Sequence, residues 1–263
     1  MQFDFIRMTE DMLDYLNFLK EEGVRSLPCA PGNSKAWQAR RASAPTPPRA
    51  AAAPASRACA EAPLPPRAAN AQPSSDALLA IAERVAVCKR CALHKTRTHA
   101  VPGQGHPAPD ILFIGEGPGE DEDLQGLAFV GAAGKLLTKM IEAMGYARED
   151  VFIANIVKCR PPHNRKPEPE EIAQCLPFLR EQISALKPKA IVALGATAVE
   201  SLLKITGITR VRGQWRSFEN IPVMPTFHPS YLLRVPSAKR DVWNDLQAVL
   251  ERLGRAVPTR TKK

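Results

Sequence analysis

The chain has 263 residues, a formal net charge of +9 and a hydrophobic fraction of 44%. This length allows one sizeable domain with an appendage or two small domains, and the composition is ordinary for a globular protein. No apolar run approaches the roughly 18 residues of a membrane span, and the N-terminus lacks the features of a secretory signal. We therefore expect a cytoplasmic protein with no membrane partner, and the positive charge favours an anionic partner such as nucleic acid.

The first 75 residues differ in composition from the rest. Residues 9–22 are predicted to be a helix, because Thr9 can cap it and apolar residues recur at helical spacing. Residues 28–75 hold ten of the 25 prolines and sixteen alanines, which predicts a disordered basic linker. The predicted organisation is an N-terminal helical segment (1–27), the linker (28–75), a folded domain (76–255) and a basic tail (256–263).

In the folded domain, short apolar runs alternate with amphipathic stretches. The runs at 111–115, 151–157 and 190–195 are typical of buried strands, and predicted helices follow them at 133–144, 168–186 and 196–204. This alternation predicts an α/β fold with three layers, α/β/α, around a mainly parallel sheet. Further along, we expect a strand pair at 211–227, a loop at 228–234 and a closing helix at 238–253.

The first predicted strand ends in the glycine turn "GEGPGEDED". A glycine turn at the carboxyl end of a strand is where many α/β proteins hold a phosphate group. This turn, however, carries five acids: Glu116, Glu120, Asp121, Glu122 and Asp123. Their charge disfavours a nucleotide-binding protein, and no GxxxxGK[ST] motif occurs in the chain.

Four cysteines form two pairs that are far apart in sequence. Cys88 and Cys91 lie in "CKRC", whereas Cys159 and Cys175 bracket a proline-rich, charged segment. Two such pairs predict a four-thiolate site that holds either zinc or an iron–sulfur cluster. The long gap between the pairs is unlike a compact zinc ribbon, so we favour a structural [4Fe–4S] cluster.

Three segments together resemble a known family. "GEGPGEDEDLQGLAFVG", "NIVKCRPPHNRKPEPEEIAQC" and "HPSYLLR", with "CKRC" upstream, are similar in order and spacing to the family 4 (iron–sulfur) uracil-DNA glycosylases over about residues 76–255. The resemblance implies a uracil-DNA glycosylase fold and hydrolysis of the bond between uracil and deoxyribose in base excision repair. It also implies a [4Fe–4S] cluster on Cys88, Cys91, Cys159 and Cys175.

The same resemblance suggests roles for residues of the uracil pocket. Phe129 matches the stacking aromatic, and the glycine turn at Gly117 allows close approach of a flipped base. Asn155, an amide inside an apolar strand, matches the residue that recognises uracil. His228 matches the histidine that stabilises negative charge on O2 of the departing base.

The residue that handles the attacking water is less clearly indicated. Family 1 enzymes carry an aspartate where this chain has Gly117, so their general base does not transfer. We expect Glu116 and Glu122 to share that role, and we interpret Asp121 and Asp123 as a solvated acidic face.

DNA contacts are expected on either side of the pocket. The "SYLLR" segment supplies the predicted wedge and a phosphate contact: Tyr231, Leu232, Leu233 and Arg234. A second basic edge is expected from Lys158, Arg160, Arg165 and Lys166, which makes binding salt-dependent.

The sequence is compatible with other functions. A non-catalytic iron–sulfur factor that binds DNA would need the fold and the cluster but not Glu116, Asn155 and His228 together. A related class traps DNA covalently through a histidine, but the inserted basic loop of that class is missing around His163. The N-terminal helix could dock on a replication or repair protein, and we expect a monomer.

Overall fold

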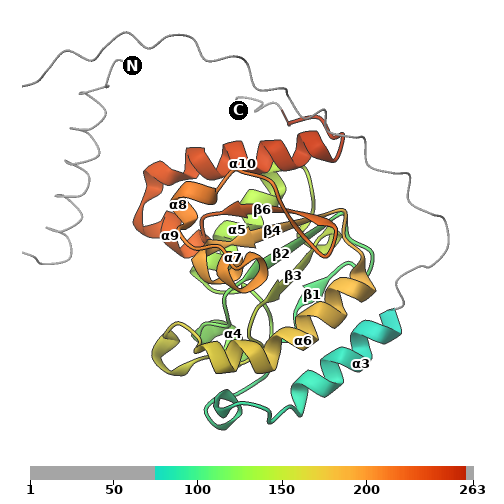
Figure 1. Ribbon diagram of the computed structural model, residues 1–263, viewed down its shortest axis with the longest axis vertical. Coiled ribbons are helices and arrows are strands. Elements are labelled where there is room, and N and C mark those ends of the chain that lie inside the picture. Colours follow the sequence, from blue (N-terminus) through green and yellow to red (C-terminus); the bar gives the residue numbers. More distant parts are fainter. Residues whose placement is uncertain (1–74, 259–263) are drawn as a thin grey trace, which may run out of the picture. The chain divides into compact units, whose positions relative to one another are not determined.

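A six-stranded sheet forms the centre of the computed structural model, which describes residues 75–258 (Figure 1). The strand order is β1-β3-β2-β4-β6-β5. The strands span Gln104–Gly105 (β1), Ile111–Gly115 (β2), Phe152–Asn155 (β3), Ala190–Leu194 (β4), Arg216–Phe218 (β5) and Ile221–Thr226 (β6). The predicted helix at 9–22 and nearly all of the predicted linker lie outside the described residues.

The four inner strands are parallel, and both edge strands are antiparallel to their neighbours. This arrangement confirms the predicted mainly parallel sheet. The predicted strand pair is the β5–β6 hairpin, whose two turn residues, Glu219 and Asn220, have positive φ angles of 49° and 65°. Such angles at both turn positions match the right-handed twist of a tight hairpin.

Side chains of the inner strands alternate between two apolar cores. On β2, Leu112 and Ile114 pack in one core, whereas Ile111 and Phe113 pack in the other. Because every residue of β2 is buried, its sequence is a continuous apolar run rather than an alternating one.

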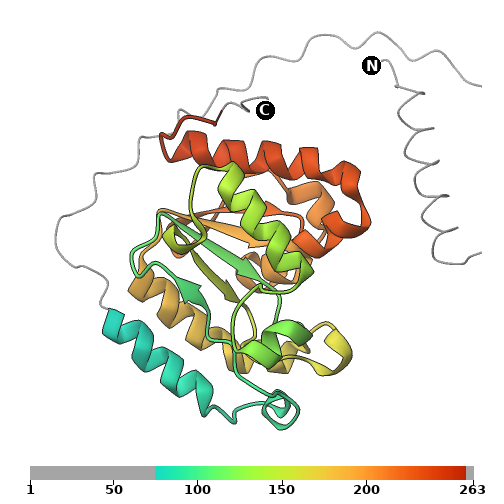
Figure 2. The ribbon, with the colours of Figure 1, turned by 180° about the vertical axis from the view of Figure 1, so that it is seen from behind.

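Helices cover both faces of the sheet, as a three-layer fold requires. One core is closed by α3 (Ser75–Ala86), α6 (Pro169–Leu186) and α7 (Gly195–Leu203), and the other by α5 (Ala132–Ala143) and α10 (Lys239–Arg252). Figure 1 shows α3 beside α6 on one side and α10 on the other, and Figure 2 shows α5 in front of the sheet. Within residues 75–258, none of the helices is long and apolar enough to cross a membrane.

Shorter helices and 3-10 turns join these elements. These are α4 (Glu120–Gln125), α8 (Ile208–Val211), α9 (Pro229–Arg234) and the 3-10 turns η1 (Ala92–Lys95), η2 (Arg148–Asp150), η3 (Pro162–Asn164) and η4 (Pro236–Ala238). The prediction that residues 228–234 form a loop is wrong, because His228 caps α9 and Pro229 occupies its first position.

Candidate active site

A cavity of about 650 Å³ opens at the carboxyl ends of the four inner strands. Glu116 follows β2, Asn155 ends β3, Leu194 ends β4 and Phe227 follows β6, and all four line the cavity. This is the edge at which parallel α/β sheets bind ligands. The structure brings these predicted site residues together in its wall: Glu116, Gly117, Glu122, Phe129, Asn155, His228, Tyr231 and Arg234.

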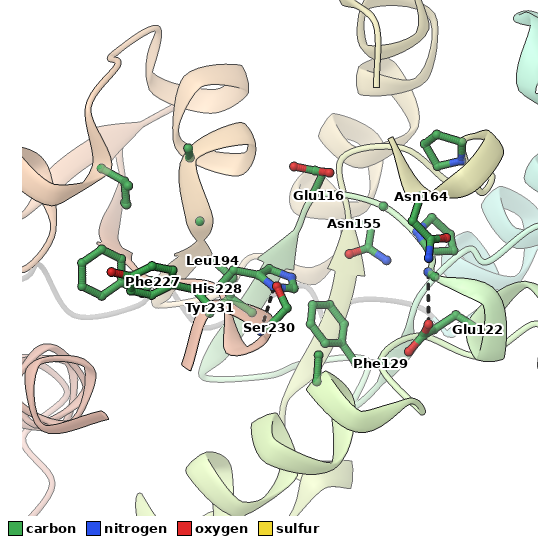
Figure 3. Close-up of a pocket in the computed structure, with 18 of the residues that line it drawn as sticks. Glu116, Glu122, Phe129, Asn155, Asn164, Leu194, Phe227, His228, Ser230 and Tyr231 are labelled. Atoms are coloured by element: carbon green, nitrogen blue, oxygen red, sulfur yellow. Dashed lines mark hydrogen bonds between the residues drawn. The ribbon is translucent and has the colours of Figure 1, made fainter. Parts of the chain in front are cut away.

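Asn155 presents an unsatisfied amide to this cavity. Its side chain is 1% exposed, and its Oδ1 is buried without a hydrogen-bond partner among the described residues. An unpaired buried acceptor costs about 1–3 kcal/mol, so such a group is expected to serve a ligand. Figure 3 shows the Asn155 amide between the side chains of Glu116 and Phe129.

Gly115 makes room for both Asn155 and Phe129. A Cβ atom at this position would lie 2.5 Å from Asn155 Oδ1 and 2.5 Å from Phe129 Cζ. Both distances are well inside van der Waals contact, so a side chain here would displace the amide, the ring or both. The last residue of β2 therefore has to be glycine for the pocket to keep its shape.

Phe129 forms one wall of the pocket in an uncommon backbone conformation. Its φ is 53°, a region that bulky residues rarely adopt, and its side chain is only 6% exposed. The ring centroid lies 5.6 Å from that of His228, with the two planes tilted by 35°. Backbone strain of this kind persists where the surroundings impose it, which is often at a binding site.

His228 is held as a neutral donor. Its Nδ1 accepts a hydrogen bond from the main-chain N–H of Ser230 at 3.1 Å, so the ring proton resides on Nε2. Burial lowers the pKa of His228 to about 4, and the positive charge of Arg234 adds to this effect. Figure 3 shows the imidazole pointing into the space that Asn155 and Phe129 also face.

The two glutamates of the glycine turn have different environments. Glu122 accepts hydrogen bonds from the main-chain N–H groups of Gly119, Val130 and Gly131 at 2.9–3.0 Å, which involves both carboxylate oxygens. Glu116 accepts at Oε2 from the hydroxyl of Thr197, and no described residue donates to its other oxygen. Main-chain hydrogen bonds thus occupy both carboxylate oxygens of Glu122, whereas Glu116 keeps one carboxylate oxygen available to the cavity.

A family comparison matches residues 102–247 to the uracil DNA glycosylase superfamily. The chain belongs to this superfamily. It is 47% identical over 186 residues to a type-4 uracil-DNA glycosylase of Sulfurisphaera tokodaii. The aligned part makes up 67% of this chain and 84% of that protein. The type-4 enzyme of Thermotoga maritima is 50% identical over 174 residues (64% and 90%), and that of Archaeoglobus fulgidus 42% over 188 residues (68% and 94%). These matches confirm the family 4 resemblance.

In this superfamily member, a second cavity is lined by the four paired cysteines: Cys88, Cys91, Cys159 and Cys175. Arg97 Nη1 lies 2.9 Å from Cys159 Sγ, and the main-chain N–H of Lys158 donates to Cys175 Sγ at 3.2 Å. Burial raises the pKa of Cys159, and raises that of Cys175 to about 11. Among residues 75–258, no three His, Cys, Asp or Glu side chains are grouped as a single metal ion would require. Cys29 and Cys59 lie outside the described residues.

Three residues expected on the surface of the glycosylase domain are buried instead. Asp123 accepts the main-chain N–H of Thr98 at 3.0 Å, so it is not part of a solvated acidic face. Lys158 is fully buried and donates to Asn155 O and Gln182 Oε1, so it is not part of a basic edge. Leu232 packs in the core on the inner side of α9, so it is not an exposed wedge.

The remaining predicted DNA contacts lie near the mouth of the pocket. Leu233 is 47% exposed and Arg234 is exposed, whereas the Tyr231 ring packs 4.8 Å from that of Phe227. Arg165, which was expected on the second basic edge, also lines the cavity, as do Asn164 and Ser230, to which the sequence analysis gave no role. For Asn164, the signal was its position in the "PPHN" turn of the loop that follows β3.

Proposed function

We propose that this protein is a uracil-DNA glycosylase of base excision repair, which hydrolyses the N-glycosidic bond of deoxyuridine in DNA and leaves an abasic site. Its membership of the superfamily and its type-4 relatives support this function. The observation that carries it is the unpaired, buried Oδ1 of Asn155, which faces a pocket bounded by Phe129 and His228.

Asn155 would distinguish uracil from cytosine by its hydrogen-bonding pattern. Uracil carries a donor at N3 and an acceptor at O4, which suit Oδ1 and Nδ2 of one amide. Cytosine carries an acceptor at N3 and a donor at N4. An amide that keeps Oδ1 towards N3 and Nδ2 towards the exocyclic group therefore pairs with uracil and not with cytosine.

Phe129 would hold the extruded base by stacking. Removing a nucleotide from the duplex costs a few kcal/mol, and stacking on an aromatic ring returns about 1–3 kcal/mol per base. Because uracil is neutral when it enters, the acids of the glycine turn do not repel it. The glycine turn around Gly117 therefore serves as a wall close to a flat ring rather than as a phosphate cradle.

His228 and Glu116 would act on the bond itself. As the bond between C1′ and N1 breaks, its electron pair moves into the uracil ring, and O2 gains negative charge. The Nε2–H of neutral His228 donates to O2, which stabilises that charge as it develops. The free Glu116 oxygen accepts from a water molecule, whose oxygen bonds to C1′ while its proton passes to the carboxylate. Glu122 instead fixes the turn that carries Phe129.

The four paired cysteines fit a [4Fe–4S] cluster. A four-iron cluster is wider than a single ion, so its ligands surround a cavity instead of converging on one point. The four cysteines surround a cavity in this way. Cysteine thiolates are its usual ligands, and donors from Arg97 and Lys158 already face two of the sulfurs. When bound, the cluster would join the segment after α3 to α6 and to the end of β3, a structural role. Thiolate ligands also agree with a reducing, cytoplasmic location.

The partner would be uracil-containing DNA, either double-stranded or single-stranded. Tyr231, Leu233 and Arg234 would contact it on one side of the pocket mouth. Arg160 and Arg165 would contact it on the other side. We expect the protein to act as a monomer. We also propose that its N-terminal residues contact a repair or replication protein.

The decisive experiment uses a labelled oligonucleotide with a single uracil, alongside thymine and cytosine versions, followed by alkali to cut abasic sites. Cleavage only at uracil is the expected result, and it should be absent with Asn155→Leu. If wild-type protein with its iron and brown colour intact produces no cleavage, the proposal fails and a non-catalytic DNA-binding factor becomes the better account.

A further inference from the structure

We infer that Arg148 is a positioning residue that holds the Phe129 stacking surface in place. This inference rests on the proposed function for its effect on catalysis. Arg148 lies in η2, directly before β3, and does not line the pocket. It reaches the pocket only through the main chain of the segment that carries Phe129.

The segment 128–131 is held from two sides by opposite charges. On one side, Nη2 of Arg148 donates to the carbonyl oxygens of Ala128 and Phe129, at 2.6 and 3.0 Å. On the other side, one Glu122 oxygen accepts from the next two N–H groups, those of Val130 and Gly131. Arg148 thus binds consecutive carbonyl groups while Glu122 binds consecutive amide groups.

This pair of contacts accounts for the positive φ of Phe129. Two neighbouring carbonyl oxygens that converge on one point repel each other unless a cation or a strong donor lies between them. A planar guanidinium meets that need, and its other arm is fixed by Nη1, which donates to Thr138 Oγ1 of α5 at 2.9 Å. Without it, the segment would lose the interaction that favours the left-handed conformation over an ordinary one.

The packing around the segment leaves little freedom once that conformation is set. A Cβ at Gly134, in the first turn of α5, would overlap with the carbonyl group of Phe129. The helix therefore packs directly on this peptide. Arg148 is also partly withdrawn from water: its pKa is lowered by burial, and the negative charge of Glu122 opposes that change. A partly buried arginine whose guanidinium is taken up by main-chain and threonine oxygens fits a role in fixing local geometry.

A double-mutant cycle tests the inference. Single-turnover rates of uracil release are measured for Arg148→Met, Phe129→Leu and the double variant, with Arg84→Met as a control that removes an arginine from a surface ion pair with Glu181. We expect Arg148→Met to lower the rate about tenfold in the wild-type background and less than twofold when residue 129 is already leucine. Arg148→Lys should recover part of the rate, and Arg84→Met should leave it unchanged. Additive losses would overturn the inference.

A second measurement does not depend on activity. Hydrogen exchange followed by mass spectrometry should show faster exchange in peptides that cover residues 128–131 of Arg148→Met and Arg148→Lys, with the peptides of β2 and β4 unchanged. Unchanged exchange at 128–131 would overturn the inference. If the wild-type protein releases no uracil, the proposed function fails, but this exchange experiment still tests whether Arg148 fixes the segment.

Discussion

Thr197, in the first turn of α7, donates its hydroxyl hydrogen to Oε2 of Glu116, in the turn after β2. Both residues lie at the carboxyl ends of neighbouring parallel strands, β4 and β2. Thr197 is buried and has little freedom to move, so its hydrogen bond fixes the carboxylate in one orientation. The remaining Glu116 oxygen then faces the cavity in which a water molecule would attack.

Thr197→Val should therefore lower kcat with little change in KM. The substitution keeps the shape of the side chain but removes a hydrogen bond to a charged group, which contributes about 1.5–3 kcal/mol. If one third to all of that energy orients Glu116 in the transition state, kcat falls roughly two- to a hundredfold. Steady-state kinetics on a uracil oligonucleotide would measure this loss. Thr197→Ser retains the hydroxyl and should stay close to wild type; an equal loss in both variants would contradict the assignment.

Glu116 and Glu122 should respond differently to the same substitution. Glu116→Gln should lower kcat about a hundredfold or more while the melting temperature stays near that of the wild type, because among residues 75–258 this carboxylate has a single hydrogen-bond partner. Glu122→Gln should lower the melting temperature as well, because a single amide oxygen replaces two carboxylate oxygens that accept three N–H groups.

Thermal unfolding and kinetics of both variants would separate the two roles. A Glu122→Gln variant with wild-type stability and a large loss of kcat would show that Glu122, rather than Glu116, handles the water.

The sequence was most informative where local pattern decides structure. The runs at 111–115 and 190–195 became β2 and β4 with the same start, because a fully buried strand needs an unbroken apolar run. The six residues of α9 are too few to show helical periodicity, so the segment was wrongly predicted to be a loop. The glycine turn at the carboxyl end of the first predicted strand does line the cavity, as ligand sites of parallel sheets usually lie at that edge.

Buried charges were the features that local pattern missed. Asp123 ends a run of acids and Lys158 begins a proline-rich, charged segment, but their partners, Thr98 and Gln182, are 25 and 24 residues away. Only the fold brings such partners together. Thr197 could have been noticed, since it follows the third parallel strand at the same edge as Glu116, whereas nothing near Arg148 in the sequence points to Phe129.

Asn155→Leu should abolish uracil release without destabilising the protein. Leucine is close to asparagine in size but has no polar side-chain atoms, and the buried Oδ1 that it removes has no hydrogen-bond partner in the described part of the chain. Removing an unsatisfied acceptor contributes about 1–3 kcal/mol of stability, so the melting temperature should stay the same or rise. Differential scanning calorimetry together with the oligonucleotide assay would measure both effects. A clear loss of stability would mean that the amide serves the fold rather than the substrate.

His228 should titrate near pH 4 in the folded protein. Burial is the main cause of its lowered pKa, and the charge of Arg234 acts in the same direction. In the unfolded chain an ordinary histidine pKa of about 6.5 is expected. Between these two values the unfolded state binds a proton that the native state does not. This difference lowers the free energy of unfolding as the pH falls from about 6.5 towards 4, and has no effect above that range.

The imidazole resonances of His228, assigned by their loss in His228→Asn, would give its pKa directly by NMR. We expect them to shift near pH 4, and the neutral donor should therefore support uracil release well below pH 6.5. In His228→Asn, the free energy of unfolding should lose the part of its pH dependence that comes from this group between pH 4 and 6.5. A resonance that shifts near pH 6.5 would contradict the assignment of a histidine that burial keeps neutral.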